Sequence, residues 1–459
     1  MVAKSLPAIA ALCALVLGGG ASSHPSLLTA AHPDEAHASQ AAPPRDPAAD
    51  GCSSDGRAGA PAGAVPLYPK LTSAYPHAPT CAFPDRDYGV GATGLGAPMI
   101  VRSVSGSTIT VSGAIPDYLA PGQTVYDISS TSPATIIPAA DTISSIDAAT
   151  NQFTLTAPPA NPPQVGDAIA AFQPVTCTEV AGVCKAWSPP ANVSVDTAHH
   201  LLRVAGANAL ITGVDLSPGG GYVFYGQDCV HPTISNVYLV VGRNGQDLMS
   251  SGGHCSGGGT IEKSTVDGAN TDDGVGVNAL FGVYYPGAWK IEYVRAINAY
   301  SDCFNVAPSA GATISATIAF TACENNASGA QKGAHADWVQ QFSDGTGTIS
   351  HSVTRHNVWV MNASALAGGQ GWSCGDRAKC VNPDLDDNLI VLPLRPGTPP
   401  SGVNFICQAD KLPGSTIRCV NNWILPTYVF VGFSRINGSG GAYVGTRNID
   451  IQTGAALGP

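Results

Sequence analysis

Short strand-like segments recur through the last part of this 459-residue chain, and their spacing restricts the folds that it can form. Examples are TISNVYLVV from Thr233, TIEKSTVDG from Thr260 and WKIEYVRAINA from Trp289. The segments begin about 25–35 residues apart, and Gly-, Ser- or Asn-rich turns lie between them. A repeat of this length cannot bury its apolar face alone, so successive repeats stack into one elongated core. The variable loop lengths favour a right-handed parallel β-helix, a solenoid, over residues 191–459.

The composition agrees with an all-β chain. Charged residues make up only 12% of the sequence, whereas Gly (53) and Pro (36) are abundant. Surface helices need charged and apolar residues on a 3.6-residue period, and this pattern is missing after the first 25 residues. The formal net charge of −11 argues against a nucleic-acid partner, because proteins that bind nucleic acid present basic surfaces.

The N-terminal third divides into three parts. Residues 1–23 have the layout of a secretory signal peptide, with Lys4 before a short apolar run. Residues 24–64 are rich in Pro and Ala and predict a disordered linker or a propeptide. Residues 65–190 predict a small all-β module with an internal repeat, since Ile109-Thr110-Val111 matches Phe153-Thr154-Leu155 and Gly122 matches Gly166. This module is expected to be a structural cap or spacer, or a carbohydrate-binding module.

The cysteines predict disulfides in a chain that carries a signal peptide. Twelve of them remain once the predicted signal peptide is removed, and several are close neighbours in the sequence: Cys177 and Cys184, Cys374 and Cys380, Cys407 and Cys419. An even number in an exported chain predicts disulfides, although the sequence does not determine the pairing. No segment is long enough for a transmembrane helix, so we expect a secreted, extracellular or periplasmic protein of undetermined oligomeric state.

The strand starts and their turns, such as TISNVYL, STVDGAN and FTACENNAS, resemble those of the pectate-lyase-like β-helix superfamily over about residues 192–459. The stretches NTDDGVGV from Asn270 and SDCFNVAPS from Ser301 are also similar to two motifs of the polygalacturonase family. That resemblance implies catalytic carboxylates at Asp272 and Asp302. The chain departs from the family at Ser301, where the family has an Asp, and it lacks the downstream Gly-His-Gly and Arg-Ile-Lys motifs.

Alignment of neighbouring repeats places four polar residues in one predicted column: Asp247, Asn278, Asp302 and Asp337. Strands in a sheet lie about 4.8 Å apart, so these carboxylates repel unless they raise a pKa, bind a cation or form hydrogen bonds. Polar columns of this kind also occur for structural reasons. For Asp302 and Asp337 we favour a functional role, because a His lies nearby.

That His belongs to the segment HADWVQQF. His335 and Asp337 are two residues apart and therefore lie on one face of a strand. Such a pair acts as an oriented general base, a metal site or a sugar-binding pair. Trp338 is either a core residue or a stacking platform for a sugar ring. A Gln or Asn follows the acid by three residues in two repeats, at Gln340 and Asn305.

A lyase also needs a cation to neutralise the uronate carboxylate. Arg355, Lys332 and Arg295 are the nearest basic residues in the sequence, and a Ca²⁺ ion held by Asp302 and Asp337 is the alternative.

We therefore expect a secreted protein that cleaves an acidic polysaccharide, either as a lyase or as a glycoside hydrolase. The alternative is a non-catalytic, extracellular glycan-binding or adhesive β-helix protein. The predicted catalytic residues are Asp302, His335, Asp337 and Arg355. The predicted substrate-binding residues are Asp247, Asp272, Trp338, Gln340 and Asn305.

Overall fold

The structure is a computed structural model, in which the chain is divided into two units at Arg45 and Asp46. All residues that it describes belong to the second unit. They are residues 76–77, 99–112, 115, 119–127, 142–160, 162–176, 186–241, 247–268, 279–299, 301–324, 337–343, 345–360, 371–376, 378–391, 403–425 and 429–458. The predicted signal peptide and linker, residues 1–64, lie outside this part, as do Cys177 and Cys184.

Six strands form the first group, which we call the small module: β1 (Met99–Ser105), β2 (Thr108–Ser112), β3 (Thr124–Asp127), β4 (Ile143–Asp147), β5 (Gln152–Leu155) and β6 (Ala168–Pro174). The two sequence repeats pair with each other, because β2 and β5 are antiparallel with Ile109 opposite Phe153. Gly122 (φ 87°) and Gly166 (φ 97°) both adopt positive φ, which glycine tolerates without a steric penalty. The repeated sequence thus produces a repeated turn.

A four-stranded sheet follows. It contains β7 (Val193–Asp196), β8 (Leu201–Ala207), β10 (Val223–Val230) and β12 (His254–Ser256). Strand β7 is antiparallel to β8, whereas β8, β10 and β12 are parallel. A 3-10 helix, η3 (Pro218–Gly220), precedes β10.

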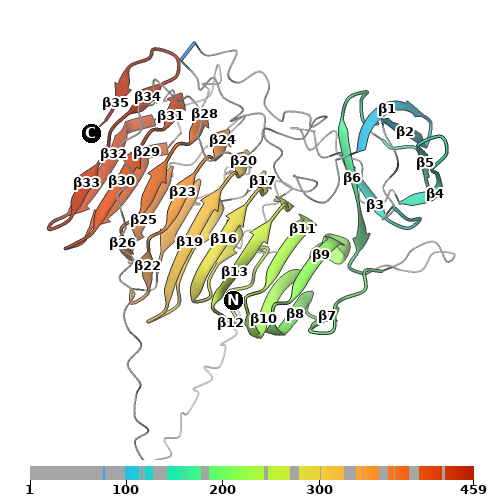
Figure 1. The fold of residues 1–459 in the computed structure, drawn as a ribbon, viewed down its shortest axis with the longest axis horizontal. Helices are drawn as coiled ribbons and strands as arrows, with labels where there is room; N and C mark the ends of the chain where they lie inside the picture. The colour runs from blue at the N-terminus through green and yellow to red at the C-terminus, as the bar shows by residue number, and fades with distance from the viewer. Residues whose placement is uncertain are drawn as a thin grey trace, which may run out of the picture. The chain divides into compact units, whose positions relative to one another are not determined.

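Most of the remaining strands continue the sheet of the small module, because Gln173 of β6 pairs with Val214, and we call this continuation the large sheet (Figure 1). Its strands are β9 (Leu210–Asp215), β11 (Thr233–Val240), β13 (Gly258–Glu262), β14 (Thr265–Asp267), β16 (Gly287–Glu292), β17 (Arg295–Ile297), β19 (Thr313–Ala319), β20 (Ala322–Glu324), β22 (Thr348–Ser350), β23 (Val353–Arg355), β24 (Val358–Val360), β26 (Lys379–Val381), β27 (Asp384–Asp386), β28 (Leu389–Val391), β30 (Thr416–Val420), β31 (Trp423–Leu425), β33 (Ala442–Val444), β34 (Asn448–Asp450) and β35 (Ala456–Leu457).

The pairing in this large sheet is parallel except between β34 and β35. Register partners on paired parallel strands are separated by 23 residues (Ile211 and Ile234) to 36 residues (Ile318 and Thr354) in the sequence. Buried isoleucines stack in register across five strands: Ile211, Ile234, Ile261, Ile291 and Ile318. The apolar positions of the sequence repeat thus form the core.

A six-stranded parallel sheet carries the predicted site. It contains β15 (Ala279–Val283), β18 (Asp302–Val306), β21 (Val339–Phe342), β25 (Trp372–Asp376), β29 (Val403–Lys411) and β32 (Val429–Gly438), in that order. Its side chains pack in one core cluster with those of the large sheet, including Phe304, Val339 and Trp372.

Disulfides join the six-stranded sheet to the large sheet at three places: Cys303–Cys323, Cys374–Cys380 and Cys407–Cys419. A fourth, Cys229–Cys255, joins β10 to β12 within the four-stranded sheet. The close sequence neighbours at 374/380 and 407/419 are therefore paired, which confirms the prediction of disulfides and supplies the pairing that the sequence left open. Each bridge restricts the unfolded chain and contributes on the order of 2–4 kcal/mol.

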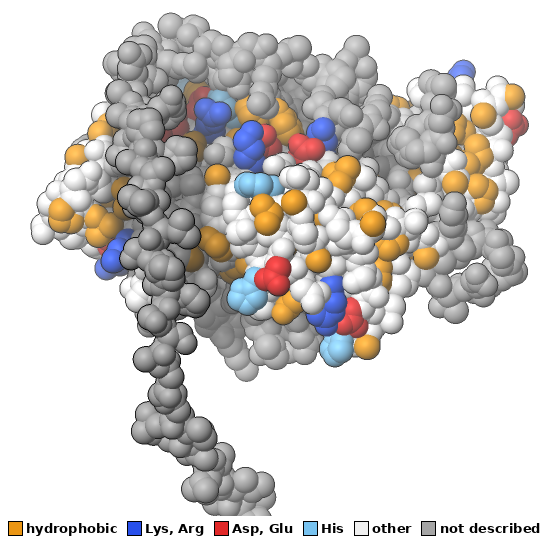
Figure 2. All heavy atoms as spheres, turned by 60° about the horizontal axis from the view of Figure 1, so that its bottom comes forward, with side chains coloured by type: hydrophobic (Ala, Val, Ile, Leu, Met, Phe, Trp, Pro, Cys, Tyr) orange, Lys and Arg blue, Asp and Glu red, His pale blue; other side chains and the backbone are white. Residues whose placement is uncertain are grey.

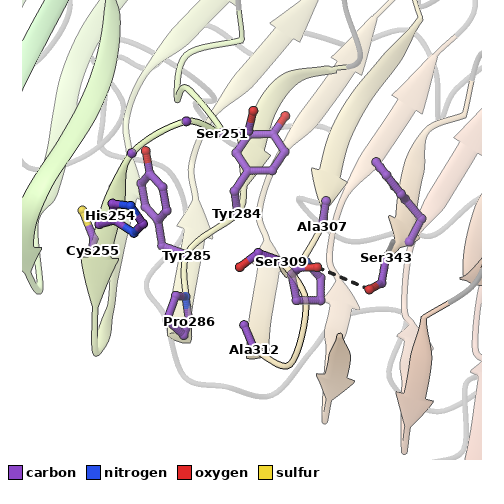
Figure 3. A pocket seen from close by; sticks show the side chains of 14 residues that line it. Ser251, His254, Cys255, Tyr284, Tyr285, Pro286, Ala307, Ser309, Ala312 and Ser343 are labelled. Atoms are coloured by element: carbon purple, nitrogen blue, oxygen red, sulfur yellow. Dashed lines mark hydrogen bonds between the residues drawn. The ribbon is translucent and has the colours of Figure 1, made fainter. Parts of the chain in front are cut away.

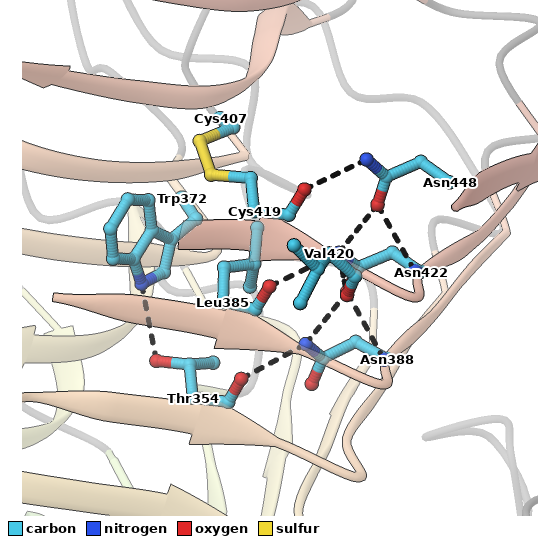
Figure 4. The surroundings of a disulfide bond; sticks show 9 residues. All are labelled: Thr354, Trp372, Leu385, Asn388, Cys407, Cys419, Val420, Asn422 and Asn448. Carbon is cyan, nitrogen blue, oxygen red and sulfur yellow. Dashed lines mark hydrogen bonds between the residues drawn. A yellow bond between two sulfur atoms is a disulfide. The ribbon is translucent and has the colours of Figure 1, made fainter. Parts of the chain in front are cut away.

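Beside the Cys407–Cys419 bridge, a column of buried asparagines connects successive strands of the large sheet (Figure 4). Asn357, Asn388, Asn422 and Asn448 are joined side chain to side chain by bonds of 2.9–3.0 Å. The Oδ1 atoms of Asn388, Asn422 and Asn448 also accept the backbone N–H of the preceding Asn in the column, at 3.1 Å. The column, here called the asparagine ladder, satisfies backbone groups at the bends, where the strand hydrogen bonds are interrupted.

Candidate functional site

The structure brings Asp302 and Asp337 together at the start of neighbouring strands. The backbone N–H of Asp337 donates a 2.8 Å hydrogen bond to Oδ1 of Asp302. In the preceding layer, the N–H of Ala279 donates at 3.2 Å to Oδ1 of Asp247. We call Asp247, Asp302 and Asp337 the carboxyl column.

The predicted register was wrong by one residue in β15. Ala279, rather than Asn278, is the register partner of Asp302. Asn278 itself lies outside the described residues. Since β15 begins with an apolar run, ALFGV, the sequence offers no internal mark that distinguishes the two registers.

The carboxyl column is buried. The exposed fractions of Asp247, Asp302 and Asp337 are 9%, 2% and 0%. Burial raises the pKa of Asp247 from 3.8 to about 7. Burial, and then the charge of Asp337, raises the pKa of Asp302 well above its usual range. The column therefore holds protons at pH values where exposed carboxyls have lost them.

Two serine hydroxyls contact Asp302 and Asp337. The Ser301 hydroxyl donates to Oδ1 of Asp302 at 3.1 Å, and the Ser373 hydroxyl donates to Oδ2 of Asp337 at 3.4 Å. Among the described residues, no group of three or more His, Cys, Asp or Glu is placed to hold a metal ion. Ca²⁺ takes six to eight oxygen ligands, and calcium binding by Asp302 and Asp337 stays a prediction.

The residues predicted to lie next to the acids have different environments. Asn305 and Gln340 are register partners. Asn305 is fully buried, and its amide has no hydrogen-bond partner in the described part of the chain. Gln340 is half-buried. Trp338 is fully buried and stacks on Trp359, with centroids 5.7 Å apart and planes 12° apart. Of the two roles considered for Trp338, the structure gives the core residue.

Arg355 lies apart from the carboxyl column. It is exposed at the end of β23 in the large sheet, in register with Asp386, whereas Asp302 begins β18 in the six-stranded sheet. The two residues therefore belong to different sheets. Because the turns between strands decide which sheet a segment enters, proximity in the sequence does not place Arg355 beside the acids.

Of the remaining candidates, the structure describes Arg295. Arg295 is buried and forms an ion pair with Glu324, which is itself fully buried. His335, Asp272 and Lys332 lie outside the described residues.

A pocket of about 510 Å³ lies beyond the ends of β15, β18 and β21 (Figure 3). The rings of Tyr284 and Tyr285 form one wall, and Ser251 and His254 lie on the same side. The remaining described lining residues are Gly252, Gly253, Cys255, Pro286, Ala307, Pro308, Ser309, Ala312, Phe342 and Ser343. No Lys, Arg, Asp or Glu occurs among these described lining residues.

Tyr284 links this pocket to the carboxyl column. Its hydroxyl donates a hydrogen bond to Oδ2 of Asp247. The ring reaches back along its own strand, since a Cβ at Gly282 would lie 2.3 Å from the Tyr284 hydroxyl oxygen. Glycine at position 282 is therefore required for this contact. Burial, and then the charge of Asp247, raises the pKa of Tyr284, so the hydroxyl keeps its proton.

The sequence analysis did not identify the pocket. Tyr284 and Tyr285 occur in the stretch ALFGVYYPG, where two tyrosines and a proline directly follow an apolar strand. Aromatic residues at the end of a strand are a usable signal for a ligand wall, since they supply large contact areas together with a polar group.

The charge distribution is mixed on the visible face of the molecule. Figure 2 shows Lys and Arg side chains close to Asp and Glu side chains among neutral residues, rather than a patch of one sign. Among the described residues, no helix has the length and apolarity needed to cross a bilayer.

No protein-family model matches the chain, and no curated protein matches it in sequence.

Proposed function

We propose that this chain is an exported, carbohydrate-active protein of the parallel β-helix class that binds a glycan in the pocket and hydrolyses it with the carboxyl column. The single observation that carries the proposal is the hydrogen bond from Tyr284 to Asp247. It connects a pocket wall to a buried carboxyl group whose pKa is raised to about 7.

The β-helix assignment is supported by the repeated parallel pairing, by the stacked isoleucines and by the asparagine ladder. These features are what a chain needs when each repeat buries its apolar face only against its neighbours. Export is supported by the four disulfides and by the signal-like N-terminus.

The chemistry of glycoside hydrolysis matches the carboxyl column. The reaction uses two carboxyl groups, one of which keeps its proton near neutral pH and donates it to the leaving oxygen. Asp247 is suited to the acid role, because burial raises its pKa. The second carboxyl group must be ionised, and the pair Asp302 and Asp337 is the candidate for it, because mutual repulsion raises the pKa of one acid of a close pair and lets the other lose its proton first.

Hydrolysis is better supported than elimination. A lyase must neutralise the uronate carboxylate. Of the described basic candidates, Arg355 lies in the large sheet and Arg295 is paired with Glu324, whereas Lys332 lies outside the described residues. The described pocket wall also carries no Lys or Arg. A neutral glycan therefore fits this wall better than the acidic polysaccharide expected from the sequence.

A non-catalytic glycan-binding protein is the second candidate. The full burial of Asp302 and Asp337, and the backbone hydrogen bond between them, favour it, because such acids also serve to hold strands in register. The two candidates differ in whether a polymer is shortened.

The deciding experiment incubates the purified chain with a panel of neutral and uronate polysaccharides. Release of reducing ends without near-ultraviolet absorbance supports hydrolysis, whereas absorbance from an unsaturated product indicates elimination. We expect Asp247→Asn and Tyr284→Phe to lower the rate strongly, and Glu292→Gln in the large sheet to serve as the matched control. Binding of a glycan without any cleavage selects the second candidate, and a panel without binding or cleavage rejects both.

A further inference from the structure

A polar surface continues from the pocket onto the four-stranded sheet. His254, which lines the pocket, begins β12 and pairs in register with Gln227 of β10. Both side chains are exposed. Tyr225 is two residues before Gln227 on the same strand, so it lies on the same face of the sheet.

Tyr225 reaches the rim of the pocket. Its ring is half-buried, and a Cβ at the pocket residue Gly252 would lie 3.8 Å from its Cε2 atom. This is ordinary van der Waals contact. The ring is therefore an aromatic extension of the pocket wall, although it belongs to a different sheet from Tyr284.

Arg203 holds this ring in place. The two residues are register partners on β8 and β10, and the guanidinium carbon lies 5.3 Å from the centre of the Tyr225 ring. The guanidinium is fixed in turn by Asp196, whose Oδ2 accepts bonds of 2.7 and 2.9 Å from it. Because Asp196 balances the charge of Arg203, the ring is oriented without a free cation beside it.

We propose that Tyr225 forms a second sugar subsite next to the pocket, so that the protein binds a neutral chain of at least two sugar units. The inference rests on the proposed function and adds the substrate class. An aromatic face accepts the apolar C–H face of a sugar ring, while Gln227 and His254 supply groups that hydrogen-bond to hydroxyls. The neutral described wall and the paired Arg203 select against a uronate at this position.

Binding measured against chain length tests the subsite. The full chain is first applied to an array of neutral and uronate oligosaccharides of one to six units. Isothermal titration then follows the best-bound series with the parent, Tyr225→Ala, Tyr225→Phe and, as a control on β33 of the large sheet, Tyr443→Ala. We expect the second unit to tighten binding of the parent by about 2- to 10-fold, in line with the contribution of one aromatic contact.

The gain in affinity from the second sugar unit should disappear in Y225A, while affinity for a single unit is unchanged. The same gain should persist in Y225F and Y443A. Thermal unfolding of each variant excludes a loss of fold. An equal gain in Y225A, no gain in the parent, or preference for the uronate series overturns the subsite. A parent that binds no glycan of any length contradicts the proposed function itself, so the two failures are distinguishable.

Discussion

The backbone N–H of Asp337 donates to a carboxylate oxygen of Asp302 across 2.8 Å, although the two residues are 35 positions apart in the chain. The bond places two acids in one buried location. Such a pair is unfavourable when both groups are ionised. Its consequences for stability and chemistry can be measured.

Asp247→Asn tests how the carboxyl column affects stability. Burial raises the pKa of Asp247 from 3.8 to about 7. A carboxyl group whose pKa is raised on folding contributes stability that is complete below pH 3.8 and is lost as the pH rises through 7. We expect the free energy of unfolding of the parent to fall over this range. In D247N, the decrease of the free energy of unfolding with pH should be smaller than in the parent by up to about 4 kcal/mol.

Urea denaturation at pH 4.5, 6 and 7.5 measures the effect. Asp384, whose pKa is raised to about 6 by burial and then by Asp386, contributes in the same direction. The comparison between parent and variant, rather than the parent alone, therefore carries the result. If the free energies of unfolding of the parent and of D247N change with pH in the same way, Asp247 is ionised at little cost in stability.

Asn388→Ala should destabilise the protein by about 2–4 kcal/mol, because it leaves several buried groups unpaired. The Asn388 side chain accepts bonds from Asn357 and donates to Asn422 and to the carbonyl oxygen of Thr354. The exposed Gln452→Ala is the control. Chemical denaturation compares the two, and equal unfolding midpoints would mean that the asparagine ladder contributes little.

Trp338→Phe separates a core role from a sugar-stacking role. Trp338 is fully buried against Trp359. We expect W338F to lower the unfolding midpoint and to leave glycan affinity unchanged. Since removal of a large buried aromatic side chain costs about 3–5 kcal/mol, W338A should be much less stable. A loss of glycan affinity in folded W338F would contradict the core role and indicate that Trp338 binds the sugar.

Removal of calcium should leave the fold unchanged. Among the described residues, no group of three or more His, Cys, Asp or Glu is placed to hold a metal ion, and Ca²⁺ takes six to eight oxygen ligands. Thermal unfolding with EDTA, and again with millimolar Ca²⁺, should give the same midpoint within about 1 °C. A rise with Ca²⁺ that is abolished in Asp302→Asn would establish the cation site predicted from the sequence.

The sequence by itself determined the strands and their repetition. Alternating apolar residues such as Ile234, Ile261 and Ile291 can be buried only if successive repeats stack, and the structure stacks them in register. It also indicated which acids lie together, because Asp302 and Asp337 occupy equivalent positions in their repeats.

Only the tertiary structure decided the rest. Tyr293 and Phe320 adopt φ of 57° and 54°, a conformation that local preference assigns to Gly or Asn, since the stack imposes the same corner on every repeat. The lengths of the loops place Arg355 in the large sheet, whereas Asp302 lies in the six-stranded sheet. The contact between Tyr284 and Asp247 depends on the space left by Gly282. Local pattern sets what a segment forms, whereas the side chains that meet across sheets are set by the packing of segments far apart in the chain.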